Sequence, residues 1–190
     1  MEKQGWSFLS LRSVAHEMEV TPMALYRHLP NSDALMAAVL ESIVDRCARV
    51  IGTGNVAHDL CEWARQFQKD LVGFPGAAGR LLTHWFESAA MLDRIEQLLE
   101  MVHGHGIGGF EAVAVTNAVF TYVLMRCEIE EQVRGCGVVR RQLRLSGASR
   151  RLPRLTALSS HYTTAEFSAH FEFGLRALVS GMNLAQGAQP

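Results

Sequence analysis

The stretch from Ser10 to Leu40 limits the possible folds more than any other part of this chain, because it begins with two short helices joined by a tight turn. Ser10 is a suitable N-cap, since its hydroxyl can accept a hydrogen bond from an unpaired amide of the first turn. Apolar residues then recur with the spacing of one helical face. They are Leu11, Val14, Ala15 and Met18. Glu19 and Val20 form the predicted turn, with Val20 small enough to be buried.

The second helix is predicted over Pro22–His28, after the N-cap Thr21. Proline suits the first helical position, where its missing N–H costs nothing. A helix this short is not stable alone, so it must pack, and Ala24 and Leu25 are the expected inward residues. The other side chains offer hydroxyl, guanidinium and imidazole groups that suit phosphate oxygens and base edges in a major groove. Beyond Pro30, Asn31 or Ser32 is expected to cap the next helix.

The pattern L-R-x-V-A-x-E-x-x-V-T-x-x-A-L-Y-R-H-L-x-x-x-D-A-L resembles the helix-turn-helix of tetracycline-repressor (TetR) family regulators, most specifically in the run ALYRHL at residues 24–29. The resemblance implies that Pro22–His28 is the recognition helix of a DNA-binding head. It also implies two groups of contact residues. Those expected at phosphates are Thr21, Tyr26 and His28, and those expected nearer the bases are Pro22, Met23 and Arg27.

Three features depart from that family pattern. Glu19 occupies the turn position where the family commonly has glycine, although a side chain is less at ease at positive φ and its negative charge would lie close to DNA. Ser32 stands where the family often has a lysine that contacts phosphate. The family also has a full helix before the one that begins at Leu11, and Met1–Trp6 matches only its tail. Either residues upstream of Met1 supply that helix or the head is incomplete.

The charge of residues 1–50 is unfavourable for a DNA-binding head, because phosphate neutralisation supplies much of the affinity. These residues carry five basic and six acidic side chains, a balance of −1. They are Lys3, Arg12, Arg27, Arg46 and Arg49 against Glu2, Glu17, Glu19, Asp33, Glu41 and Asp45. This balance supports an alternative function, a ligand-binding or protein-interaction helical bundle with a degraded DNA-binding head.

The rest of the chain predicts an all-α fold, with a DNA-binding domain over residues 1–50 and a ligand-binding and dimerisation domain over residues 51–190. Further helices are predicted over residues 32–50, 56–72, 76–82, 86–103, 109–133 and 164–185. The helix at 109–133 is apolar on nearly all sides from Ala112 to Met125, so we expect it to be buried all round. The segment Phe171–Leu175 resembles the last helix of proteins with a tetracycline-repressor-like C-terminal domain. That resemblance implies a two-fold homodimer held by a four-helix bundle.

Large, adaptable side chains in the C-terminal helices have two interpretations, a filled core or an apolar effector cavity with a few polar anchors. His84, His103, Asn117 and Thr121 are the candidate anchors, because polar groups on apolar helices must find a partner. The full set of candidate ligand-binding residues is Trp63, Phe67, His84, Trp85, His103, Asn117, Phe120, Thr121 and Met125.

Other functional classes find little support in the sequence. The four cysteines form no C-x-x-C pair, and without a secretion signal they are expected to be free thiols. His103-Gly-His105 is more typical of a turn than of a metal site, and no catalytic motif argues for an enzyme. The longest weakly polar run, Ala112–Met125, has 14 residues and is too short for a membrane span. The arginine-rich segment 134–162 is interpreted as a solvated crossover, with a basic patch for a partner as the alternative.

Together these features predict a cytoplasmic, homodimeric transcriptional repressor that a small, largely apolar effector releases from double-stranded operator DNA. Two copies would place the Pro22–His28 helices in successive major grooves of a near-palindromic operator. We expect no cofactor, no metal ion, no membrane association and no enzymatic activity. A helical-bundle enzyme would need an acid, base or metal constellation that the sequence does not display.

Overall fold

The computed structural model describes residues 9–47, 52–84, 88–133, 151–161, 166–182 and 184, and every regular element in these residues is a helix. This confirms the all-α prediction. The elements are α1 (Leu11–Glu17), α2 (Pro22–Tyr26), α3 (Ser32–Arg46), α4 (Val56–Val72), α5 (Ala77–His84), α6 (Ala89–His103), α7 (Gly109–Val133), α9 (Pro153–Leu158), a 3-10 helix (Ser159–His161) and α10 (Phe167–Gly181).

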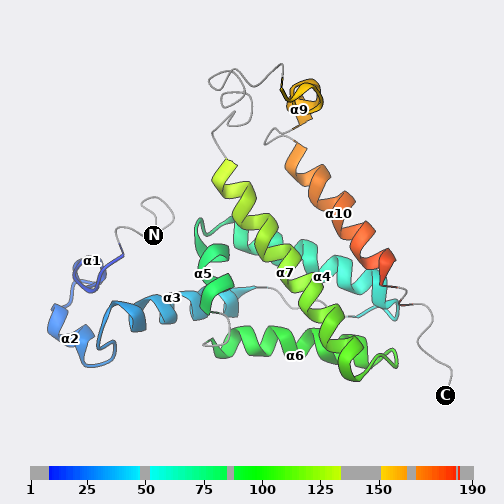
Figure 1. Ribbon diagram of the computed structural model, residues 1–190. Helices are drawn as coiled ribbons and strands as arrows, with labels where there is room; N and C mark the ends of the chain where they lie inside the picture. Colours follow the sequence, from blue (N-terminus) through cyan, green and yellow to red (C-terminus); the bar gives the residue numbers. More distant parts are fainter. Residues whose placement is uncertain are drawn as a thin grey trace.

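The short helices α1 and α2 lie at one end of the molecule, and α3 runs from them into a bundle formed by α4 to α7 and α10 (Figure 1). Helix α7 crosses the bundle and packs against α4, α5, α6 and α10. The main hydrophobic core takes residues from α3 to α7 and from α10, including Leu40 and Val44 of α3. The C-terminal half of α3 is therefore part of the bundle, while its N-terminal half follows the head.

Local side-chain caps fix where the head helices begin. The hydroxyl of Ser10 accepts from the amide of Ser13 at 3.1 Å, and the hydroxyl of Ser13 accepts from the amide of Ser10 at 3.0 Å. Thr21 Oγ1 accepts from the amide three residues further on at 3.3 Å, and Asn31 Oδ1 does the same at 2.8 Å. The predicted caps Ser10 and Thr21 are confirmed, and Asn31 is the cap of α3.

The observed ends of α2 and α3 differ from the predicted ones, and α9 was not predicted. Helix α2 ends at Tyr26 rather than His28, with Arg27 as its C-cap in helical angles. Pro30 has no N–H with which to continue the helix. Helix α3 ends at Arg46 rather than Val50, with Cys47 already extended. Helix α9 lies in the segment expected to be a loop, and its start carries no side-chain cap hydrogen bond that the sequence could have displayed. The bounds of α4 and α7 agree with the prediction.

Helix α7 is not buried on all sides, which corrects the prediction made from its composition. One face is uncovered: Phe110 is 88% exposed, Val113 50% and Met125 42%. The segment Gly109–Gln132 is also long and apolar enough, by length and composition alone, to cross a bilayer, so the shorter run counted in the sequence underestimated it. Its contacts with four neighbouring helices place it as the central helix of the bundle.

A buried carboxylate of α4 accepts hydrogen bonds from the residues that precede this helix. Asp59 is 1% exposed and accepts from the amide of Thr53 at 2.8 Å, from the Thr53 hydroxyl at 2.6 Å and from the amide of Gly54 at 3.3 Å. Burial alone would raise the pKa of Asp59, but these hydrogen bonds outweigh it and hold the pKa below its ordinary value. The ionised carboxylate therefore stabilises the folded chain.

Replacing this carboxylate tests its contribution. Asp59→Ala is expected to lower the free energy of unfolding by about 1.5 kcal/mol near neutral pH, because three donors lose a charged acceptor. Since the folded pKa is depressed, the wild-type advantage should be complete above the ordinary value of 3.8 and should disappear as the pH falls through the folded pKa. Urea unfolding at pH 7 and pH 3 measures this, with Asp93→Ala on the exposed side of α6 as control. An unchanged difference between the two pH values would contradict the assignment.

Candidate nucleic-acid interface and effector site

Helix α2 is held to the head from one side only. In the described residues it packs mainly against α1, whose Leu11 and Ala15 are buried. Leu25 is half-buried, as predicted, but Ala24 is exposed, which corrects the prediction that both face inward. Val20 is 41% exposed rather than buried. One neighbouring helix covers only one side of a five-residue helix, so α2 has a single inward side chain.

The six residues predicted to contact DNA are all exposed, and they lie in α2 or next to its ends. Successive residues of a helix are turned by about 100°, so Met23 and Arg27 lie opposite Leu25. Tyr26 lies to one side of them and is 46% exposed, while Met23 is 69% exposed. The Thr21 oxygen accepts from a backbone amide, which leaves its O–H able to donate to a phosphate. Met23 and Arg27 therefore protrude from the side of α2 opposite Leu25, and the Tyr26 hydroxyl lies beside them.

Glu19 adopts the strained conformation expected for the turn. Its φ is 56°, and it is the one non-glycine residue with positive φ among the residues that the structure describes. This left-handed conformation costs an L-residue about 1 kcal/mol relative to glycine. The turn therefore keeps the geometry of a glycine turn while carrying a carboxylate next to the N-terminus of α2.

The predicted aromatic lining of an effector cavity is a packed cluster. Trp63, Phe67 and Phe120 are 2%, 3% and 4% exposed. The ring centroids of Trp63 and Phe67 are 4.9 Å apart, and Phe120 lies 6.4 Å and 6.0 Å from them. Such distances are typical of favourable aromatic contacts. Of the two interpretations, a filled core is the one that these three rings match. An effector could bind between the rings only by separating them.

The remaining predicted ligand residues are not gathered around these rings. Asn117, Thr121 and Met125 lie on the exposed face of α7, and His84 and His103 are exposed at the ends of α5 and α6. Trp85 lies outside the described residues. The polar pair on α7 was expected to point into the core because the helix looked buried all round. Its polar side chains instead mark the face that the bundle leaves uncovered.

A polar connection between α3 and α6 was missed by the sequence reasoning. Glu41 of α3 accepts from the Ser88 hydroxyl at 2.5 Å and from the amide of Ala90 at 2.8 Å, at the N-terminus of α6. Arg94 of α6 is 5% exposed and donates to the backbone oxygens of Val44 at 3.1 Å and Asp45 at 3.3 Å, near the C-terminus of α3. A charged residue on the apolar face of α6 was the available signal.

Buried polar atoms with unused hydrogen-bonding capacity lie in α6 and α7. Arg94 Nε, Gln97 Oε1 and Thr116 Oγ1 have no hydrogen-bond partner, and Thr116 is 1% exposed. Groups of this kind are expected to find a protein or water partner.

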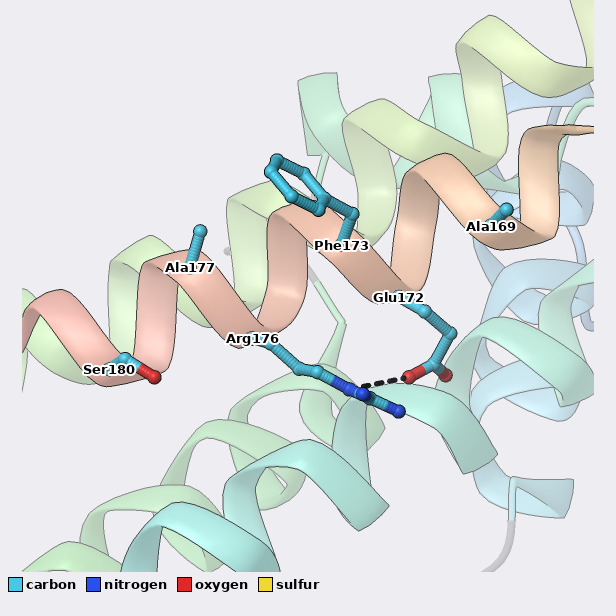
Figure 2. Close-up of a pocket in the computed structure, with 6 residues that line it drawn as sticks. All are labelled: Ala169, Glu172, Phe173, Arg176, Ala177 and Ser180. Atoms are coloured by element: carbon cyan, nitrogen blue, oxygen red, sulfur yellow. Dashed lines mark ion pairs between the residues drawn. The ribbon is translucent and has the colours of Figure 1, made fainter.

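Helix α10 presents an outer surface with a protruding ring. Phe173 is 79% exposed and points away from the bundle, while Glu172 and Arg176 point toward α4 (Figure 2). Glu172 accepts from Arg65 Nε at 2.8 Å and Nη2 at 2.9 Å, and pairs with Arg176 at 3.7 Å. The Arg65 guanidinium holds the pKa of Glu172 below its ordinary value. A shallow depression beside Phe173 is lined by Ala169, Glu172, Phe173, Arg176, Ala177 and Ser180.

A helix-turn-helix head carried on an all-helical bundle is the architecture of a large class of transcriptional regulators. Residues 51–185 match the family described as "Tetracyclin repressor-like, C-terminal domain". This chain therefore belongs to the tetracycline-repressor family of transcriptional regulators.

Individual relatives agree with this membership. An HTH-type transcriptional regulator of Saccharopolyspora erythraea is 22% identical over all of this chain and 82% of its own length. Among solved structures, a possible TetR family transcriptional regulator from Streptomyces coelicolor A3(2) is 25% identical with a TM-score of 0.82, covering 97% of this chain and 94% of that one.

Two further structures of the same fold contain bound molecules. The Streptomyces coelicolor TetR family protein ActR, in complex with actinorhodin, is 20% identical with a TM-score of 0.81 and covers 99% of this chain and 92% of that one. Mycobacterium smegmatis BioQ with its natural double-stranded DNA operator is 25% identical with a TM-score of 0.65, covering 94% and 88%. At 20% identity the ActR likeness establishes the fold alone.

Proposed function

We propose that this regulator is a cytoplasmic homodimeric repressor that binds a near-palindromic operator through α2 and is released by a small, largely apolar effector. The observation that carries the proposal is the exposure of all six predicted contact residues, which lie in α2 or next to its ends. BioQ, which has the same fold, binds its operator as duplex DNA. In a two-fold dimer the α2 helices would enter successive major grooves about 34 Å apart.

The aromatic side chain of α2 offers a direct test of the DNA-binding face. Tyr26→Ala is expected to weaken operator affinity about tenfold, because it removes a phosphate-contacting hydroxyl and an exposed ring beside the duplex. Because Tyr26 is 46% exposed, the thermal midpoint and the dimer should be unchanged. Fluorescence anisotropy with a selected operator duplex at moderate salt measures the affinity. Tyr26→Phe separates the hydroxyl from the ring, and wild-type affinity in Tyr26→Ala would argue against this face.

The proposed dimer would use the uncovered faces of α7 and α10. Helix α7 exposes a row of residues with helical spacing, and α10 exposes Phe173. The α7 row comprises Phe110, Val113, Asn117, Thr121, Met125 and Ile129. An exposed row in which four of six residues are apolar, on the longest of the described helices, is typical of an interaction site. Two such pairs of helices from two subunits can form a four-helix bundle.

The proposed effector response passes from the bundle to the head through α3 and α6. Glu41 and Arg94 connect these helices at two places, so a displacement of α6 changes the position of α3 and with it the head. An effector that separates the Trp63 and Phe120 rings would act on α4 and α7, which pack against α6. Its leverage equals the difference between its affinities for the two conformers.

A further inference from the structure

We propose that Met23 and Arg27 form a two-residue reading unit, in which Met23 contacts a thymine methyl group and Arg27 binds a guanine within about two base pairs of it. The proposal rests on the proposed function, since it assumes that α2 enters the major groove. It goes further by naming the base chemistry that an operator half-site must contain.

The position of these two side chains follows from the single inward residue of α2. Leu25 is the one half-buried residue of α2, and the others are exposed, so its direction defines the packed side of the helix. With about 100° between successive residues, Met23 and Arg27 each lie about 20° from the direction opposite Leu25. Arg27 keeps helical angles, with φ −67° and ψ −28°, so the helical geometry extends to it. The two side chains therefore form the part of α2 that protrudes farthest.

The spacing of the pair limits how far apart its two bases can lie. Residues at i and i+4 on a helix have Cβ atoms about 5–6 Å apart. Successive bases of one strand are separated by about 3.4 Å along the duplex axis. The two side chains therefore reach bases that are neighbours or are separated by one base pair.

The chemistry of each side chain selects its base. The thioether of Met23 donates no hydrogen bond, is 69% exposed and adapts its shape to apolar surfaces. The C5 methyl of thymine is the apolar group that the major groove presents. The Arg27 guanidinium carries a planar fork of donors that matches the O6 and N7 acceptors of guanine.

The other exposed residues of α2 are less suited to base reading. Tyr26 lies about 80° from the protruding direction and would face the wall of the groove. Ala24 lies about as far on the other side, and its methyl group is too short to cross that distance.

The experiment uses the full chain and duplexes selected from a randomised library at about 50 mM salt. In the strongest selected duplex, each thymine is replaced by deoxyuridine, which lacks only the C5 methyl, and each guanine by 7-deazaguanine, which lacks N7. One deoxyuridine position is expected to weaken binding about fourfold, and one 7-deazaguanine position about fivefold. The two positions should lie within two base pairs of each other in each half-site.

Variants assign these effects to the two side chains. Met23→Ala should bind the thymine and deoxyuridine duplexes equally, and Arg27→Ala should bind the guanine and 7-deazaguanine duplexes equally. Met18→Ala is the matched control, because Met18 is 58% exposed but lies in the turn, and it should keep the wild-type sensitivity to both replacements. Sensitivity to the methyl group that persists in Met23→Ala, or sensitive positions more than two base pairs apart, would overturn the inference while leaving DNA binding intact. A chain that selects no duplex would overturn the proposed function and this inference with it.

Discussion

Gly174→Ala is expected to lower the free energy of unfolding by about 2 kcal/mol, because α7 and α10 leave no room for a methyl group at this position. An added Cβ would overlap with Tyr122 Oη and would lie 3.0 Å from Cζ and 3.2 Å from Cε2 of the same ring. Tyr122 cannot yield easily, since its hydroxyl donates to the backbone oxygen of Phe171 at 2.9 Å and its ring lies 5.6 Å from the Phe171 ring. Urea unfolding followed by circular dichroism measures the loss.

A second site and a second variant show whether the overlap is the cause. Gly181→Ala, in the same helix, places its Cβ where no heavy atom lies within 4 Å and should leave stability unchanged or slightly higher. Adding Tyr122→Phe to Gly174→Ala should recover about half of the loss, since the ring is then free to tilt. A Gly174→Ala protein with wild-type stability would mean that the two helices separate readily. The close approach of α7 and α10 would then not be part of the stable fold.

The head was predictable from sequence because its signals are local. Ser10 and Thr21 cap helices through amides three residues away, and such short-range hydrogen bonds depend on little beyond neighbouring residues. The positive φ of Glu19 was expected from the resemblance, because the family commonly has glycine at this turn position. The choice between Asn31 and Ser32 as the cap of α3 was left open, because either side chain could accept the same kind of bond. The exposure of Ala24 depends on how many helices cover α2, and no local sequence pattern indicates that number.

The helices of the bundle were predictable from the sequence, but which face of each helix is buried was not. An apolar stripe that packs in a core and an apolar stripe that awaits a partner have the same composition, so α7 was expected to be buried all round. Asn117 and Thr121 were accordingly placed inside, although both are exposed. The position of a polar residue on an apolar helix is decided by the neighbours of that helix. Those neighbours are fixed by the tertiary fold.

The candidate coupling between head and bundle illustrates the same limit at longer range. Glu41 reaches Ala90 across 49 residues, and Arg94 reaches Val44 across 50. Each hydrogen bond pairs a backbone group near a helix end with a side chain from another helix, as a cap from the same helix would do. Sequence spacing contains no information about such a partner. Buried charge on an apolar helical face is the signal that could have indicated Arg94.

Phe173→Glu is expected to raise the dissociation constant of the proposed dimer at least about a hundredfold, with α10 itself intact. Phe173 is 79% exposed in the single chain, so the substitution costs little when the chain is alone. In the proposed four-helix bundle the same position is covered, and a carboxylate there would be buried without a partner. Sedimentation velocity over a range of concentrations measures the dissociation. Affinity for a two-half-site operator should fall with it, because each monomer holds only one α2.

A matched substitution separates loss of the interface from a general effect of added charge. Leu92 is also an exposed apolar residue, 47% exposed, but it lies on α6 and outside the faces of α7 and α10. Leu92→Glu should therefore remain dimeric and bind the operator with wild-type affinity. Binding to a duplex with a single half-site should be the same in both variants and in the wild type, because the head is untouched. If Phe173→Glu stays dimeric at micromolar concentration, the subunits associate through another surface, and the spacing of the two α2 helices must be derived from that surface instead.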